Sequence, residues 1–348
     1  MIDWVSFFVD YEHDIPIHDG YLAKMDSDGN IISCFTRYDF VQGSYDDKVV
    51  IKSDESSMKN DHYTKLYISG NPSKFLQGHN LFGSDDLNLL INGFFSSICQ
   101  LYTRIPINLS PEERFKLTSG QYRLTRVDCT YMYDVGSLSN ALSWLRQAEK
   151  TATLSHRGRG QLIKGSTLYF GKNSKKWSLK IYAKGEEFKT NPNLDYGYHE
   201  KLVDYANKSL RVELTIRSQQ LKKFNLEFGC DWCDNTVIDI HKMCLKGFNM
   251  SDITYASIDN LDELSASSKG AYAMWEKGID LRTIYSKAQF YRHRKNILDV
   301  LGIDIISVPQ NLTDENVIPF VRFIEAVPMG VPGWAVGTDL YYEPKKIA

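Results

Sequence analysis

The chain lacks the features that mark secreted and membrane proteins. It has six cysteines in 348 residues, too few for a disulfide framework in a chain of this length, which indicates a reducing compartment such as the cytoplasm. No stretch approaches the ~20 apolar residues of a membrane span. The opening segment MIDWVSFFVDYEHD carries acids and no basic stretch, so we expect no secretory signal.

The sequence also has little net charge and no nucleotide-binding motif. The formal charge is −2, so the protein is not basic as a whole. Its cations are concentrated, however, because residues 155–184 contain eight Lys or Arg and no Asp or Glu. Such a field suits a polyanion, although a solvated basic loop would give the same pattern. The Gly-rich stretches match neither a P-loop nor a GxGxxG turn, which argues against a nucleotide-dependent enzyme.

The most unusual stretch is residues 167–188, which read as two strands joined by a polar turn at 171–176. Alternation in the second strand predicts an apolar face toward a core and a polar face with three members: Lys180, Tyr182 and Lys184. A tyrosine is therefore expected between two cations on one side of a sheet.

Two further segments, 123–133 and 210–217, show the same alternation. Their predicted polar faces carry Arg126, Asp128, Arg211, Glu213 and Arg217. If the three strands are neighbours, these side chains would line one metal-dependent site with a tyrosine nucleophile. Cross-strand ion pairs on a solvated antiparallel sheet would produce the same pattern, and the pattern alone leaves both interpretations open.

The chain is predicted to be an α+β protein in two regions. Residues 1–225 are expected to form a nuclease domain with a central antiparallel sheet and flanking helices, and residues 226–348 a mainly helical accessory region. Helices are predicted at about 87–102, 138–150, 198–208, 235–246, 267–278 and 286–301. The first of these would begin at an N-cap at Ser84 or Asp85, after an irregular connection over 69–87.

The C-terminal region offers a second candidate for DNA binding. Two helices joined at 278–280 could form a helix-turn-helix-like reader, with an ordinary helical hairpin as the alternative. The exposed cations of the last helix are Arg292, Arg294 and Lys295. A following apolar run at 317–327 contains a proline and is predicted to be an edge strand or docking segment.

Two groups of residues are candidate metal ligands. His79 lies in the Gly-flanked segment QGHN rather than on an apolar face, and imidazole is a common metal ligand. Residues 230–244 have the outline C-x2-C-x7-H-x2-C, which can bind zinc. The middle gap of that outline is short and the segment reads as helix, so the pattern favours a role in packing there.

Several segments are recognisable. Residues 74–87, 124–131, 209–229 and 316–348 closely resemble the gene II replication initiators of filamentous bacteriophages. The resemblance extends nearly end to end, and QGHN and the terminal motif are its most specific parts. The hairpin at 165–187 also resembles the catalytic region of rolling-circle plasmid initiators, through a more widespread motif.

This resemblance implies a site-specific DNA endonuclease. Such a protein nicks one strand of the double-stranded replicative form at the phage origin, and later cleaves and rejoins the displaced strand. A tyrosine hydroxyl attacks a phosphodiester and keeps the 5′-phosphate as a phosphotyrosine link, with help from a divalent cation, Mg2+ or Mn2+. Host helicase and polymerase would be partners, the cytoplasm of the bacterial host would be the location, and no membrane would be involved.

The resemblance also assigns roles to residues. Tyr182 would be the nucleophile, Lys184 would stabilise the phenolate or the phosphate, and Tyr169 would be a reserve nucleophile. The implied metal ligands are Asp128, Glu213 and His79. The expected DNA contacts are Arg157, Arg159, Lys164, Lys172, Lys175, Lys176, Lys180, Arg292, Arg294 and Lys295.

The chain departs from related nucleases in three ways. It has no paired histidines in an HUH motif, and it has Tyr67 near the position where plasmid initiators carry an acid. No tyrosine lies four residues from Tyr182, so the reaction cycle would need a second subunit, as in a homodimer on DNA, or a water. The alternative is a non-catalytic origin-binding regulator of DNA replication.

Overall fold

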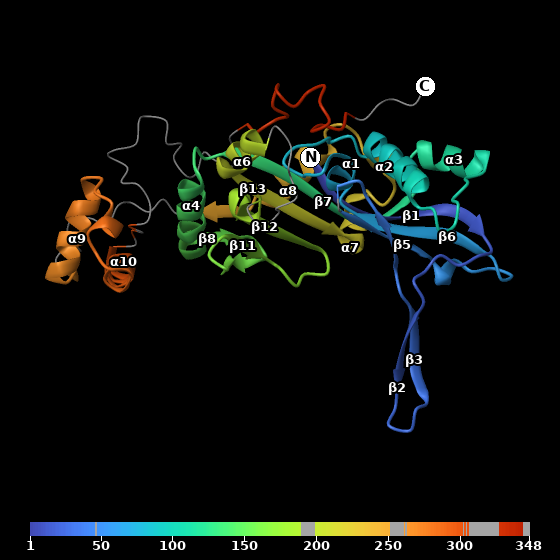
Figure 1. Ribbon diagram of the computed structural model, residues 1–348, viewed down its shortest axis with the longest axis horizontal. Helices are drawn as coiled ribbons and strands as arrows, with labels where there is room; N and C mark the ends of the chain where they lie inside the picture. Colours follow the sequence, from blue (N-terminus) through green and yellow to red (C-terminus); the bar gives the residue numbers. More distant parts are fainter. Residues whose placement is uncertain are drawn as a thin grey trace.

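The computed structural model describes residues 1–45, 47–188, 199–250, 261, 263–301, 303, 305 and 327–343. Its centre is a nine-stranded sheet in the order β10-β11-β12-β13-β7-β1-β6-β5-β4, with every neighbouring pair antiparallel. The α+β fold with a central antiparallel sheet is therefore confirmed (Figure 1).

The strands of this sheet are β1 (Ile2–His13), β4 (Asp39–Gln42), β5 (Lys48–Ser53), β6 (Tyr63–Gly70), β7 (Arg123–Asp134), β10 (Gln161–Ile163), β11 (Thr167–Phe170), β12 (Trp177–Ala183) and β13 (Ser209–Arg217). A small second sheet contains β8 (Ala152–Leu154), β9 (Gly158–Arg159) and β14 (Phe248–Met250). The main body also includes the helices α1 (Pro72–Gln77), α2 (Leu87–Leu101), α3 (Pro111–Thr118), α4 (Leu138–Thr151), α5 (Lys184–Phe188), α6 (His199–Asn207), α7 (Ser218–Phe224) and α8 (Thr236–Leu245).

The apolar face of the sheet carries the main core. Alternate residues of β7, β12 and β13 pack there against α2, α4 and α8, whose apolar stripes recur at helical spacing. Burial of Phe94 and Ile240 in one cluster shows that α8 belongs to the same core as α2. The proposed division into residues 1–225 and 226–348 stays a prediction, but the packing of α8 continues the first region beyond its predicted end.

The polar face of the sheet is also covered at one end. A second cluster packs Leu81 and Phe82 against Met132 of β7, Leu202 of α6 and Leu340 of the segment 327–343. That segment is tied to the sheet by the Met329 N–H, which donates to the Met132 carbonyl at 2.7 Å. All of β13 except Arg217 is buried as a result, so its charged side chains do not face open solvent.

Two local predictions between β6 and α2 are wrong. Residues 72–77 are helical rather than irregular, because Asn71 caps α1 by accepting the Lys74 N–H at 2.9 Å and Pro72 opens its first turn. The N-cap of α2 is Asp86, whose carboxylate accepts the Leu89 N–H at 2.9 Å. Asp85 instead forms an ion pair with the N-terminal ammonium at 2.5 Å.

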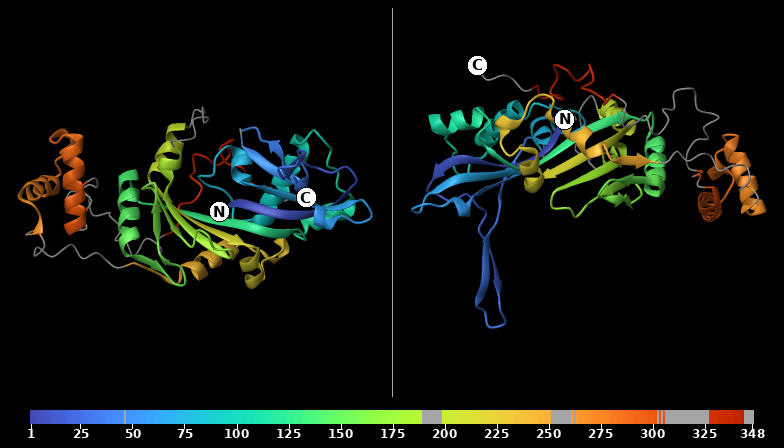
Figure 2. Two further views of the ribbon diagram at one scale, coloured as in Figure 1. Left: turned by 90° about the horizontal axis from the view of Figure 1, so that it is seen from below. Right: turned by 180° about the vertical axis from the view of Figure 1, so that it is seen from behind.

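A two-stranded hairpin of β2 (Tyr21–Met25) and β3 (Ile31–Thr36) projects from the main body (Figure 1). The views from below and behind show it standing clear of the sheet (Figure 2). The single strand predicted over 31–40 is thus divided, since β3 belongs to this hairpin and β4 to the main sheet.

The C-terminal helices α9 (Ala266–Glu276) and α10 (Lys287–Leu301) pack on each other around Trp275, Phe290 and Ile297. The two predicted helices are confirmed within two residues at each end. The predicted apolar segment 317–327 lies outside the described residues except for its last position. None of the described helices is long and apolar enough to cross a membrane.

Candidate active site

The three predicted polar strands are neighbours, in the order β12-β13-β7. Their register sets Lys180 opposite Glu213, and Thr215 opposite Asp128. Glu213 and Asp128 are therefore diagonal neighbours on one face, a relation that places side chains about 7–8 Å apart. The predicted convergence of Tyr182, Glu213 and Asp128 on one face of the sheet is present in the structure.

Tyr182 lies within this face with 3% of its surface exposed. Its hydroxyl donates to Glu213 Oε2 at 3.3 Å, and Lys180 Nζ lies 3.9 Å from its ring centroid. Burial raises the pKa of Tyr182 well above its ordinary value, while Arg211, its partner across the strand pair, acts in the opposite direction. The phenol is protonated at neutral pH, with a carboxylate in position to receive its proton.

Asp128 is buried next to the Glu213 carboxylate. Arg126 donates to both of its oxygens, Nε to Oδ1 at 2.8 Å and a terminal nitrogen to Oδ2 at 2.5 Å. Burial nevertheless raises the pKa of Asp128 to about 6, because the negative charges of Glu213 and Asp3 add to the cost of ionisation that Arg126 opposes. Two carboxylates that repel each other in a buried place are an arrangement that a cation would stabilise.

A buried ionic network adjoins Tyr182. Arg211 is fully buried and forms an ion pair with Asp3 at 2.8 Å. Asp3 also accepts hydrogen bonds from the amides of Asn71 at 2.7 Å and Asn80 at 2.8 Å. Burial opposes ionisation of Asp3, but Arg211, Lys184 and the two amides outweigh it and hold the pKa of the carboxyl below its ordinary value.

Lys184 connects this network to the start of α5. Its Nζ donates to Asn80 Oδ1 at 2.8 Å and to Glu187 Oε2 at 3.0 Å, and it lies 5.8 Å from the Tyr182 ring centroid. Burial, followed by repulsion from Arg211, lowers the pKa of Lys184 to about 8. The predicted position of Lys184 beside Tyr182 agrees with the structure.

Sequence analysis missed Asp3, Asn71, Asn80 and Glu187. Asp3 lies where the register of β1 against β7 shifts between Ile2 and Trp4, a bulge that simple alternation does not reveal. The signal available in the sequence was Arg211, an arginine within an otherwise apolar strand pattern, which requires a buried acid as partner.

His79 is buried in the cluster beside α6 rather than joined to the carboxylates. Its Nδ1 accepts the Leu81 N–H at 3.3 Å, its ring meets Phe82 edge-on, and its Nε2 has no hydrogen-bond partner within the described part of the chain. Burial lowers the pKa of His79 to about 4, so the imidazole is neutral. Among the described residues no three His, Cys, Asp or Glu side chains are grouped to hold a metal ion, so the predicted set of Asp128, Glu213 and His79 is not assembled.

The donor chemistry of the carboxylates still fits a divalent cation. Asp128 and Glu213 supply hard oxygen ligands from adjacent strands, as Mg2+ and Mn2+ prefer. The zinc alternative at 230–244 is not supported, because Cys230 and Cys233 are exposed while the buried His241 bonds the Cys129 carbonyl at 3.1 Å.

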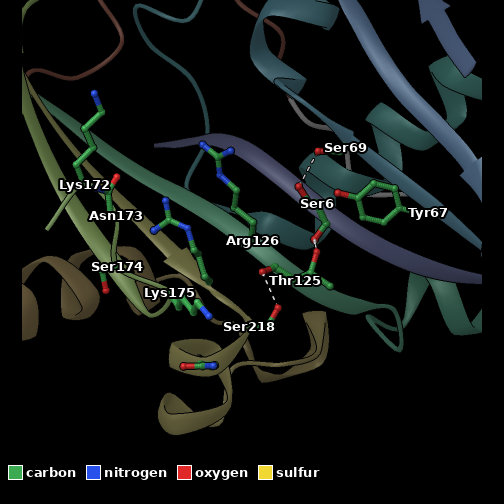
Figure 3. A pocket seen from close by; sticks show the side chains of 12 residues that line it. Ser6, Tyr67, Ser69, Thr125, Arg126, Lys172, Asn173, Ser174, Lys175 and Ser218 are labelled. Carbon is green, nitrogen blue, oxygen red and sulfur yellow. Dashed lines mark hydrogen bonds between the residues drawn. The ribbon is translucent and has the colours of Figure 1, made fainter. Parts of the chain in front are cut away.

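A groove of about 700 Å³ runs along the same face beside Asp128. Figure 3 shows the β11–β12 turn with Lys172 and Lys175 on one side, and Arg126 and Tyr67 on the other. The complete lining is Ser6, Tyr67, Ser69, Thr125, Arg126, Lys172, Asn173, Ser174, Lys175, Arg217, Ser218 and Gln219. The lining contains four cations, several hydroxyl and amide groups and no carboxylate.

The other predicted DNA contacts are dispersed. Arg157 stacks on Trp177 at 4.4 Å, Tyr169 is half-buried under Lys172, and Lys180 pairs with Glu213 at 3.5 Å. The exposed ones are Arg159, Lys164 and Lys176, together with Arg292 and Lys295 of α10, while Arg294 is half-buried. Only Lys172 and Lys175 of the predicted set line the groove.

Comparisons with known proteins agree with this arrangement. Two models of the phage replication-associated protein encoded by gene II match the chain, the N-terminal model over residues 1–235 and the C-terminal model over residues 259–345. The replication-associated protein of Enterobacteria phage I2-2 is 36% identical over 337 residues, covering 95% of each chain. Those of phages M13 and f1 are 25% identical over 188 residues, 47% of this chain and 42% of theirs.

The matches place the chain among the replication-associated proteins of bacteriophages. It belongs to the gene II family of these proteins, which confirms the resemblance found from the sequence. A solved rolling circle replication initiator protein from Geobacillus stearothermophilus matches 74% of this chain and 89% of its own, with 12% identity and a TM-score of 0.31. A similarity that weak supports no conclusion about fold or function.

The buried ion pair gives a first prediction. Asp3→Ala and Arg211→Met should each lower the free energy of unfolding by about 3–5 kcal/mol, because each leaves an unpaired buried charge. The double variant should lose clearly less than the sum of the two, as measured by urea unfolding. Asp204→Ala, which breaks an exposed pair with Lys208, should cost under about 1 kcal/mol. Additive losses at Asp3 and Arg211 would contradict the coupling.

Proposed function

We propose that the chain initiates rolling-circle DNA replication by nicking one strand of double-stranded replicative-form phage DNA at the origin, and later cleaves and rejoins the displaced strand. The observation that carries this proposal is the Tyr182 hydroxyl donating to Glu213 on the sheet face that also holds Asp128 and the cationic groove. Family membership supports a role in replication. Host helicase and polymerase are the proposed partners, in the bacterial cytoplasm.

The proposed reaction is a transesterification at phosphorus. The Tyr182 oxygen forms a bond to the phosphorus of the scissile phosphodiester, the bond from phosphorus to the 3′-oxygen breaks, and the 3′-oxygen leaves as a hydroxyl. The phenol proton passes to Glu213, its hydrogen-bond partner. The 5′-phosphate stays on the tyrosine, so the later joining step needs no external energy source.

Burial of Tyr182 implies a rearrangement when DNA binds. Lys180 lies over the Tyr182 ring and pairs with Glu213, yet its own side chain is 27% exposed. A phosphate arriving from the groove would compete with Glu213 for this ammonium group. Withdrawal of Lys180 would open the ring to the phosphate and leave Glu213 as a stronger base, so substrate and catalyst would be coupled by one side chain.

Asp128 and Glu213 are the residues that would hold a divalent cation in this site. When bound, Mg2+ or Mn2+ would neutralise charge on the scissile phosphate and stabilise the transition state. Arg126 would then be free to turn from Asp128 toward the groove that it already lines. His79 is not needed in this arrangement.

The groove suits a single DNA strand. Its cations can contact phosphates, its hydroxyl and amide groups can bond sugar and phosphate oxygens, and Tyr67 offers a ring on which a base can stack. The lining has no carboxylate to repel the backbone. This property favours nucleic acid over a cationic or apolar ligand.

The nucleophile can be tested by removing one oxygen atom. Tyr182→Phe should lower nicking of an origin oligonucleotide by roughly 10³-fold or more and abolish the covalent protein–DNA adduct, while DNA affinity is retained. Tyr169→Phe is the matched control and should retain both activities. An adduct that persists in Tyr182→Phe and maps to Tyr169 would show that the reserve nucleophile is the real one. Binding without any cleavage by the unaltered chain would favour the regulator.

The groove can be tested by salt dependence. Lys172→Gln combined with Lys175→Gln should reduce the slope of log affinity against log salt for single-stranded DNA by about 1.4, since each phosphate contact contributes about 0.7. Lys242→Gln with Lys246→Gln is the control, because these lysines are exposed at the C-terminal end of α8, which covers the other face of the sheet. Equal slopes in the two double variants would exclude the groove as the DNA track.

The metal proposal has a readout that is independent of cleavage. Titration calorimetry with Mn2+ in the absence of DNA should detect binding that Asp128→Asn and Glu213→Gln remove, and that the surface control Asp204→Asn retains. Chelation should stop nicking but leave DNA bound, and added Mg2+ should restore nicking. Nicking that continues in excess chelator would contradict the proposal.

A further inference from the structure

The hairpin of β2 and β3, here called the arm, presents an unusual surface. Six large apolar side chains on it are between 58% and 64% exposed, namely Tyr21, Leu22, Met25, Ile31, Ile32 and Phe35. The two strands pair only with each other among the described residues. An isolated two-stranded hairpin is marginally stable in water, and soluble monomers rarely expose contiguous apolar patches of this kind.

The arm is nevertheless well formed at both ends. At its tip the Asp26 carboxylate accepts the N–H groups of Asp28 at 3.0 Å and Asn30 at 2.8 Å, which fixes the turn. At its base the Arg37 N–H donates to the Gly20 carbonyl at 2.9 Å. The sequence thus specifies a defined ribbon whose shaft is the unsatisfied part.

The charges of the arm argue against DNA as the occupant of this surface. Lys24 is the one cation along residues 21–36, and Asp26 and Asp28 place two carboxylates at the tip. Phosphate groups would be repelled from the end that would have to enter a groove. The exposed surface therefore suits a protein.

We propose that the arm binds the arm of a second copy of this chain and so forms a symmetric dimer. Leu22 and Phe35 lie directly opposite each other in the hairpin register and form one apolar patch. Within the described part of the chain both outer backbone edges of the ribbon are unpaired, so two copies can join edge to edge into a four-stranded antiparallel sheet. A self-complementary patch of this kind satisfies two-fold symmetry.

The size of the surface agrees with this occupant. The six exposed apolar side chains offer roughly 700 Å² per arm, judged from the 150–250 Å² that a large aromatic residue can bury. A stable protein interface buries about 800 Å² on each partner. Pairing of the arms alone comes close to this area without any contribution from the main body.

Sedimentation of the full chain without DNA tests the dimer. The wild type should form a species of twice the 40.0 kDa chain mass as concentration rises. Leu22→Lys combined with Phe35→Lys should weaken this association at least roughly 100-fold, through lost burial and like-charge repulsion. Phe115→Lys is the control, since Phe115 is 63% exposed on α3, away from the arm, and it should not change the association.

A mixing experiment separates loss of contact from loss of folding. A second double variant, Leu22→Glu with Phe35→Glu, should also be monomeric alone. Mixing it with the Lys double variant should restore a dimer, because opposite charges then meet across the symmetry axis. A wild type that stays monomeric at every concentration, or a Lys double variant that dimerises as well as the wild type, would overturn the proposal. So would variants that stay monomeric when mixed.

Discussion

The ion pair between Asp3 and Arg211 is the constraint on which the candidate active site depends. A guanidinium with no solvent exposure must be paired to remain in the interior, and Asp3 supplies the partner at 2.8 Å. The pair joins the first strand of the chain to β13, while Asn80 extends it to the loop before α2 and Lys184 to α5. Segments far apart in the sequence are thus fixed around Tyr182 by one set of charges.

The same charges set the chemistry of the proposed nucleophile. Burial makes the Tyr182 phenolate costly, and Arg211 opposite it in the register partly compensates. Lys184 is less basic than usual because it is buried and shares this space with Arg211. In a medium of low dielectric, such pairwise effects exceed those at a surface. Activation of the phenol therefore awaits a change in the surrounding charges, which the arrival of DNA phosphate would provide.

The strands and their faces could be predicted from sequence, because alternation is strict in β7, β12 and β13 and each has one apolar side. Their order could not, since register between distant strands depends on the whole sheet. Helix α1 was missed because Asn71, Pro72 and Gly78 read as turn residues, although they are equally good as caps. The role of Asp3 depends on a bulge, and the burial of His79 on the packing of segment 327–343, and neither is visible in a local pattern.

Two tyrosines now share the polar face of the sheet. Tyr169 is opposite Lys180 in the register of β11 and β12, so it is a diagonal neighbour of Tyr182. A cycle that cuts the displaced strand while one end is still linked to Tyr182 needs a second nucleophile. Tyr169 would supply it within one chain, under the cation of Lys172, whereas a dimer joined by its arms would supply a second Tyr182. The arm lies outside the nuclease face, so pairing through it would leave both grooves open to DNA, and the two routes are compatible with a single fold.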